Sequence, residues 1–301
     1  MKKTPPNLKK GDTVGIIAPA RKVTLSDIEY ARHIFESWGL EVVFGAHLFG
    51  ACNQFSGTDA ERASDFQTML DDVDVKAIFC ARGGYGCVKV VDLIDFTNFV
   101  KNPKWLIGYS DITVFHAHIQ NVCGIETLHA TMPVNLLPMA YTSETLKTLQ
   151  QVLFGKPLKF SVKHHPFNRC GIAEGILVGG NLSVLYSLMG SNSDIDTTHK
   201  ILFIEDLDEY LYHIDRMMMC LKRARKLKNL NGLIVGGMSK MNDNTIPYGK
   251  TAYQIIKDIV AEYAYPVCFD FPAGHTNDNR ALILGRKITM TLSEKETRIE
   301  F

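Results

Sequence analysis

The chain lacks the sequence features of several protein classes. Its 301 residues include 7 cysteines, but no two of them have CxxC spacing. Such scattered cysteines are typical of free thiols in a reducing compartment and argue against a disulfide frame or a zinc site. No apolar run approaches the ~18 residues of a membrane span, and prolines stand where a secretion signal needs its apolar core. We therefore expect a cytoplasmic protein with no membrane partner.

The chain also lacks an excess of charge of either sign. Lys and Arg total 33 and Asp and Glu total 32, so the formal net charge is +1. The basic run "KRARKLK" (residues 222–228) ends a predicted helix, where cations complement the helix dipole. Neither feature indicates nucleic-acid binding. A small-molecule or peptide substrate is the simpler expectation.

The remaining pattern predicts an α/β protein. Strand-like segments at residues 12–20, 40–45, 75–84 and 104–109 alternate with helix-like segments at 24–39, 58–72, 86–95 and 111–122. This alternation is typical of a largely parallel sheet covered on both faces. Residues 156–171 have little periodicity and read as a linker between domains at 1–155 and 172–301. The second domain is predicted to contain helices near 209–227 and 253–263 and a terminal β pair at 281–293.

Three chemically useful side chains stand at or just after the ends of predicted strands. They are Ser110 after "KWLIGY", Glu205 at the end of "KILFIE" and His275 after "VCFDFPAG". The carboxyl ends of strands are where sites form in open α/β sheets. Serine needs an imidazole to take its proton, and the imidazole needs a carboxylate to orient it. Each residue also has a plain interpretation: a helix cap for Ser110, a strand-end residue for Glu205, and a turn residue for His275.

A glycine loop, "ARGGYG" at residues 81–86, follows one of these strands. Glycines allow backbone N–H groups to face a ligand, so Gly84, with the N–H of Asp111, is our candidate for an oxyanion hole. A phosphate-binding loop is the alternative, although the GxGxxG and Walker patterns are both missing.

Other polar residues give weaker indications. His116 and His118 are two positions apart on a predicted helix and cannot share a metal ion from it. Asn181 or Ser183, in "GGNLS", either caps a helix or lines the cleft. We expect no metal and no cofactor.

Taken together, these motifs resemble the LD-carboxypeptidase family of serine peptidases. The matching segments are "GDTVGIIAPA", "ARGGYG", "IGYSDIT", "GGNLS", "FIED" and "AGH". The resemblance implies a Rossmann-like or flavodoxin-like first domain, a smaller α/β second domain, and an active site at their interface. It makes Ser110 the nucleophile, His275 the base and Glu205 its orienting acid. It also implies cytoplasmic cell-wall recycling, in which a homodimer removes the terminal D-alanine of murein tetrapeptides.

Details of substrate recognition stay open in the sequence. Residues 129–135 ("HATMPVN") depart from the family's "HGPM" pattern. Arg82 is a candidate clamp for a substrate carboxylate, with Tyr85 and Asn181 as further candidates for substrate binding. The alternative functions are an immunity-type peptidase that cuts a peptide–nucleotide antibiotic and a non-enzymatic protein that binds a phosphate ligand.

Overall fold

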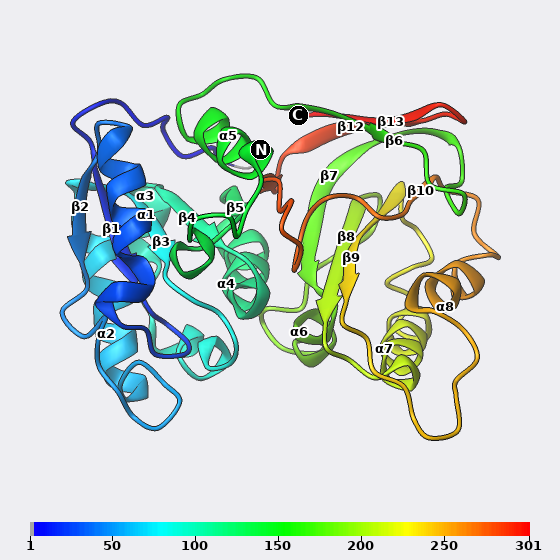
Figure 1. The fold of residues 1–301 in the computed structure, drawn as a ribbon, viewed down its shortest axis with the longest axis horizontal. Coiled ribbons are helices and arrows are strands. Elements are labelled where there is room, and N and C mark those ends of the chain that lie inside the picture. Colours follow the sequence, from blue (N-terminus) through cyan, green and yellow to red (C-terminus); the bar gives the residue numbers. More distant parts are fainter. Residues whose placement is uncertain (1–2) are drawn as a thin grey trace.

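The computed structural model describes residues 3–301 and contains two β-sheets side by side (Figure 1). The first sheet has the order β11-β5-β4-β3-β1-β2 and is parallel except where β11 meets β5. Its strands are β1 (Thr13–Ile17), β2 (Glu41–Phe44), β3 (Val75–Cys80), β4 (Trp105–Gly108), β5 (Thr127–His129) and β11 (Leu282–Leu284).

Helices cover both faces of the first sheet. Val14 and Ile16 of β1 pack in one core cluster with α1 and α5, whereas Ile17 packs in the other with α2, α3 and α4. Burial on both sides explains why β1 and β4 are continuously apolar rather than alternating. The helices are α1 (Leu25–Ser37), α2 (Asp59–Asp71), α3 (Thr97–Lys101), α4 (Thr113–His118) and α5 (Ser143–Leu153), with shorter turns η1 (Cys87–Lys89), η2 (Val91–Leu93), η3 (Ser110–Ile112), η4 (Ile119–Cys123) and η5 (Pro133–Asn135).

The second sheet has the order β10-β9-β8-β7-β12-β13-β6. The half from β10 to β7 is parallel, and α6, α7 and α8 pack on one of its faces (Figure 1). The other half is antiparallel. Its elements are β6 (Lys159–Lys163), β7 (Gly171–Asn181), α6 (Leu182–Ser187), β8 (Ile201–Leu207), α7 (Leu211–Arg223), β9 (Gly232–Ser239), α8 (Ala252–Ile259), β10 (Val267–Cys268), β12 (Lys287–Leu292) and β13 (Glu296–Glu300).

The structure differs from the sequence-based expectation in four places. The strand expected before His275 is only the two residues Val267–Cys268. The predicted linker contains β6, which pairs with β13. The predicted terminal β pair is split, because β11 joins the first sheet and β12 joins the second. The helix predicted at residues 86–95 is two short 3-10 turns, η1 and η2. The chain therefore crosses between the two sheets more often than a single linker implies.

None of the helices described for residues 3–301 is both long and apolar enough to cross a membrane.

Candidate active site

Ser110 lies on a left-handed turn between β4 and α4. Tyr109 follows β4, and Ser110 has a φ of 65° and opens η3, which leads into α4. A positive φ is unfavourable for a residue with a Cβ, and strain of this kind is often found at functional sites. Tyr109, not Ser110, occupies the cap position of η3, and no side-chain cap hydrogen bond is made there. The helix-cap interpretation of Ser110 is therefore wrong.

Glu205 and His275 form an acid–base pair. Glu205, in β8, is fully buried, and its Oε2 accepts hydrogen bonds from His275 Nδ1 at 2.7 Å and from the His275 backbone N at 3.1 Å. Gly274 has a φ of 101°, and a Cβ at this position would lie 2.5 Å from Glu205 Oε2. Glycine therefore gives the carboxylate room to reach the histidine. Because Nδ1 is occupied, Nε2 is the ring nitrogen left to exchange a proton with a substrate or nucleophile.

The environment of this pair changes two pKa values. Burial alone would lower the pKa of His275, but the charge and hydrogen bond of Glu205 outweigh burial, so the pKa is raised above 6.5. Burial, with the Glu205 charge adding to it, raises the pKa of Asp206 to about 7. The Asp206 carboxylate accepts hydrogen bonds from Asn181 Nδ2 and from the backbone N of Ser183 and Leu207.

Contacts between the two sheets bring the serine turn toward this pair. The Tyr109 ring meets the His275 ring edge-on, with centroids 4.8 Å apart. Behind it, the backbone N of Asn181 donates to Thr113 Oγ1 at 3.0 Å, which ties α4 to the end of β7. Gly180 permits this approach, since a Cβ there would lie 2.5 Å from Thr113 Oγ1. Residues from strand ends of both sheets therefore meet at one interface.

The glycine loop lies against the serine. A Cβ at Gly83 would lie 3.2 Å from Ser110 Oγ and 3.3 Å from the backbone N of Asp111. Gly84, the candidate oxyanion residue, has a φ of 108° and packs against the Arg21 side chain. The buried Asp111 carboxylate accepts a hydrogen bond from the backbone N of Cys87 at 2.8 Å, which fixes the loop to the serine turn. Burial raises the pKa of Asp111.

Buried histidines lie behind this interface. His116 Nε2 bonds Gly108 O at 2.9 Å, and burial lowers the pKa of His116 to about 4. His129, in β5, is fully buried against the rings of Tyr109 and Phe203, and burial lowers its pKa as well. Both histidines are therefore neutral packing groups. Across residues 3–301, no three His, Cys, Asp or Glu side chains are grouped as a metal site would require.

A cavity of about 230 Å³ opens beside His275. Tyr109 forms part of its wall, as do Thr131 and Asn135 from the segment that departs from the family pattern. Lys240 also lines it. No motif in the sequence points to Lys240, although this residue directly follows β9 and so obeys the same strand-end rule that identified Glu205.

The three residues expected to bind substrate are not among those that line this cavity. Arg82 is half-buried, and its charge lowers the pKa of Asp27, after the larger effect of the hydrogen bonds from Thr24. Tyr85 is exposed and lies near the Phe55 ring. Asn181 caps α6: its Oδ1 accepts from Val184 N and Ser183 Oγ, and its Nδ2 donates to Asp206.

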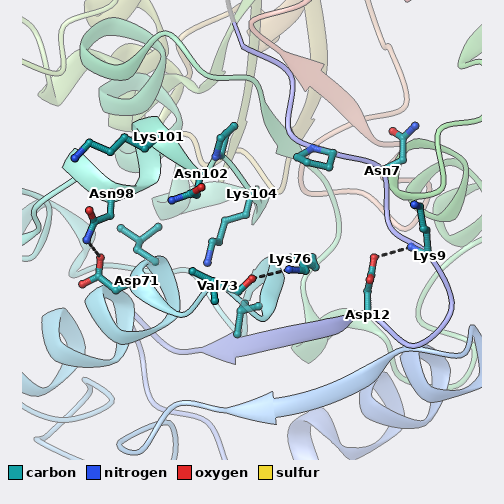
Figure 2. A pocket seen from close by; sticks show the side chains of 14 residues that line it. Asn7, Lys9, Asp12, Asp71, Val73, Lys76, Asn98, Lys101, Asn102 and Lys104 are labelled. Atoms are coloured by element: carbon teal, nitrogen blue, oxygen red, sulfur yellow. Dashed lines mark hydrogen bonds between the residues drawn. The ribbon is translucent and has the colours of Figure 1, made fainter.

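A larger cavity, of about 740 Å³, lies at the opposite edge of the first sheet, where β1, β3 and β4 begin (Figure 2). Lys104 and Lys76 line it, but their ammonium groups are already used. Lys104 Nζ donates to Met69 O and Asp72 O, and Lys76 Nζ donates to Val73 O. These bonds satisfy carbonyls at the carboxyl end of α2. Burial lowers the pKa of Lys104 to about 8. We assign this cavity no part in the chemistry.

Known protein families and curated proteins resemble this chain along most of its length. The LD-carboxypeptidase N-terminal domain matches residues 14–130, and the LD-carboxypeptidase C-terminal domain matches residues 174–290. A probable murein peptide carboxypeptidase of Bacillus subtilis (strain 168) is 36% identical and covers 98% of this chain and 94% of its own length. The chain belongs to the LD-carboxypeptidase family. Ser110 lies in the first matched range, and Glu205 and His275 lie in the second.

Two further LD-carboxypeptidase relatives show how far the likeness extends. The crystal structure of a muramoyltetrapeptide carboxypeptidase from Oxalobacter formigenes has a TM-score of 0.88 and 25% identity, and the match covers 96% of this chain and 98% of that one. The microcin C7 self-immunity protein MccF of Escherichia coli is 25% identical and covers 97% of this chain and 94% of its own length. The two-sheet arrangement is thus the arrangement of the family.

Proposed function

We propose that this chain is a serine carboxypeptidase that hydrolyses the L,D peptide bond before the terminal D-alanine of murein tetrapeptides. The observation that carries the proposal is the pair of hydrogen bonds that His275 donates, from Nδ1 and from its backbone N, to Glu205 Oε2. It holds the imidazole in one tautomer and directs Nε2 away from the acid, as a general base requires. The relatives named as murein peptide and muramoyltetrapeptide carboxypeptidases support the choice of substrate.

In the first step, His275 Nε2 takes the proton of Ser110 Oγ as the oxygen attacks the carbonyl carbon before the D-residue. Glu205 stabilises the imidazolium that forms. The backbone N–H groups of Gly84 and Asp111 are the proposed donors to the oxyanion. The closeness of the loop to the serine supports this assignment: a Cβ at Gly83 would lie 3.2 Å from Ser110 Oγ and 3.3 Å from Asp111 N, and Gly84 is the next residue.

In the second step, the C–N bond breaks and His275 returns the proton to the leaving amine of D-alanine. A water molecule then gives a proton to His275 and attacks the acyl-enzyme, which releases the shortened peptide and restores the serine. No metal ion or cofactor takes part in this proposed sequence.

Replacing the nucleophile tests the proposal. Ser110→Ala should abolish release of D-alanine from murein tetrapeptide, measured by mass spectrometry, while Ser187→Ala, an exposed serine on α6, should retain it. A fluorophosphonate probe should label wild type at Ser110 and should fail to label His275→Gln. Retained turnover in Ser110→Ala would rule out the serine mechanism. Saturable phosphate binding without any turnover would favour the non-enzymatic alternative.

A peptide–nucleotide amide is the alternative substrate. Two solved MccF structures share this fold with TM-scores of 0.86 and 0.85, and the second is a complex with aspartyl sulfamoyl adenosine. Parallel incubations with murein tetrapeptide and an aminoacyl sulfamoyl nucleoside separate the two functions. We expect turnover of the tetrapeptide to dominate.

We further propose that the enzyme works in the cytoplasm on recycled cell-wall peptides, and that it forms a homodimer. Light scattering should then give twice the 33.7 kDa mass of one chain. Fractionation of cells should place the protein with cytoplasmic markers, and a monomer or a periplasmic location would contradict the respective proposal.

A further inference from the structure

Lys240 stands at the edge of the cavity beside the catalytic base. It directly follows β9, has a φ of 51°, and lines the 230 Å³ cavity together with His275. The preceding residue, Ser239, donates a hydrogen bond from its Oγ to the backbone O of His275 at 2.6 Å. This hydrogen bond therefore joins the backbone next to Lys240 to the backbone of His275.

The positive charge of the Lys240 ammonium group has no carboxylate partner among the described residues. The cavity lining contains Lys240 but, over the described part of the chain, neither Asp nor Glu. No carboxylate within residues 3–301 lies within ion-pair distance of Lys240, whereas Lys226 and Lys200 each pair with an aspartate. Such a cation beside a catalytic base is suited to binding an anionic group of the substrate.

A second polar group at the cavity also lacks a partner. Asn279 is 3% exposed, and its Nδ2 has no hydrogen-bond partner among the described residues. Its Oδ1 accepts a hydrogen bond from Gly274 N at 2.9 Å, which holds the side chain in place. A buried amide donor without an acceptor is unfavourable unless a ligand supplies one. Asn279 Nδ2 needs an oxygen acceptor and Lys240 favours a negative charge, so a carboxylate would satisfy both groups.

We propose that Lys240, assisted by Asn279 Nδ2, binds the α-carboxylate of the substrate's terminal residue. The inference rests on the proposed carboxypeptidase function. In such a substrate the carboxylate lies one residue beyond the scissile carbonyl, at most ~3.6 Å further along the chain. The groups that bind it must therefore share a pocket with the base, as Lys240 and His275 do. Arg82, the candidate from sequence, does not line that pocket.

The test compares two substrates that differ only at the carboxyl end: murein tetrapeptide with a free D-alanine carboxylate, and the same peptide ending in D-alaninamide. For Lys240→Met, kcat/KM on the free acid should fall roughly 10- to 100-fold, with little change on the amide. Lys240→Arg should recover most of the preference for the acid, and Lys240→Glu should reverse it. Lys295→Met, at an exposed lysine in the β12–β13 turn, serves as the control.

The outcomes separate this inference from the proposed function. A Lys240→Met enzyme with the wild-type ratio of acid to amide turnover would overturn the carboxylate assignment while leaving the peptidase intact. Loss of the preference in Arg82→Met but not in Lys240→Met would overturn it in favour of Arg82. Wild-type enzyme that releases neither D-alanine nor D-alaninamide would refute the proposed function and this inference with it.

Discussion

Replacing Glu205 by glutamine should remove the charge beside His275 and leave the shape of the pair intact. The glutamine oxygen can take the place of Oε2, which accepts both hydrogen bonds from His275. Its NH₂ group would then take the place of Oε1, which is buried and has no partner within residues 3–301. The substitution thus tests the charge itself rather than the geometry.

The structure sets the expected size of the effect. With Nδ1 and Oε2 2.7 Å apart, the charge centres of an imidazolium and Glu205 lie about 4 Å from one another. At an effective dielectric constant of about 20 their attraction is about 4 kcal/mol. Since about 1.4 kcal/mol corresponds to a factor of ten, kcat should fall on the order of 10³-fold.

The pH dependence should shift in a defined direction. His275 must be neutral to act as a base, so activity is lost as the pH falls through its pKa. In the wild type this pKa is raised above 6.5, with Glu205 overcoming the effect of burial. Without the Glu205 charge, burial dominates and the pKa drops. The acidic limb of kcat/KM should therefore lie above pH 6.5 in the wild type and below it in Glu205→Gln.

The assay is D-alanine release from murein tetrapeptide between pH 5 and pH 9. Asp65→Asn is the matched control, because Asp65 also accepts hydrogen bonds from both the backbone N and Nδ1 of one histidine, His47, away from the cavity. Its pH profile should match the wild type. An unshifted acidic limb in Glu205→Gln, or a loss in kcat below tenfold, would refute the assigned role of Glu205.

Three further substitutions make separate predictions. The pKa of Asp206 is raised in the folded state, so its contribution to stability is present at low pH and is lost as the pH rises through about 7. Between pH 5 and pH 7, urea unfolding should show wild type losing about 2 kcal/mol relative to Asp206→Asn, and a constant difference would contradict the raised pKa. Gly274→Ala forces a Cβ against Glu205 Oε2. It should lower kcat/KM about 10²-fold, because it displaces the proposed base His275. Near-normal kinetics would contradict this prediction and show that the loop relaxes. Lys104→Met removes the ammonium group that donates hydrogen bonds to Met69 O and Asp72 O. It should reduce the free energy of unfolding by about 1–3 kcal/mol without changing kcat. An unchanged urea midpoint would contradict this stabilising role of Lys104.

Local patterns were enough to place the strands next to two of the proposed catalytic residues. The apolar segment before Ser110 and the one ending at Glu205 are strands β4 and β8, as predicted, because burial on both faces demands a continuous apolar run. The family motifs pointed to the same residues. Local sequence failed at β6, whose strand character depends on pairing with β13, nearly the full length of the second domain away. A strand stabilised by such a distant partner carries little local signal.

Substrate recognition shows the same division. Arg82 belongs to the glycine loop and does not line the cavity beside His275, whereas Lys240, which the sequence motifs do not include, does. The residues that line this cavity come from segments as far apart as Tyr109 and Asn279, and only the packing of the two sheets makes them neighbours. The sequence allows Asn181 to be either a cap or a cleft residue, and its hydrogen bonds to Val184 and Asp206 show that it caps α6.

The residue pattern alone indicates a serine, an acid and a histidine after predicted strands, because the loops at the carboxyl ends of parallel strands are where sites form. The tertiary structure decided how these groups act. It buried Glu205 against His275, and this carboxylate raises the pKa of the imidazole. It placed Ser110 in a left-handed turn, and among the described residues it put no Asp or Glu on the cavity wall beside Lys240. Burial, strain and the absence of a counter-charge arise only when distant segments pack together, and no local pattern encodes them.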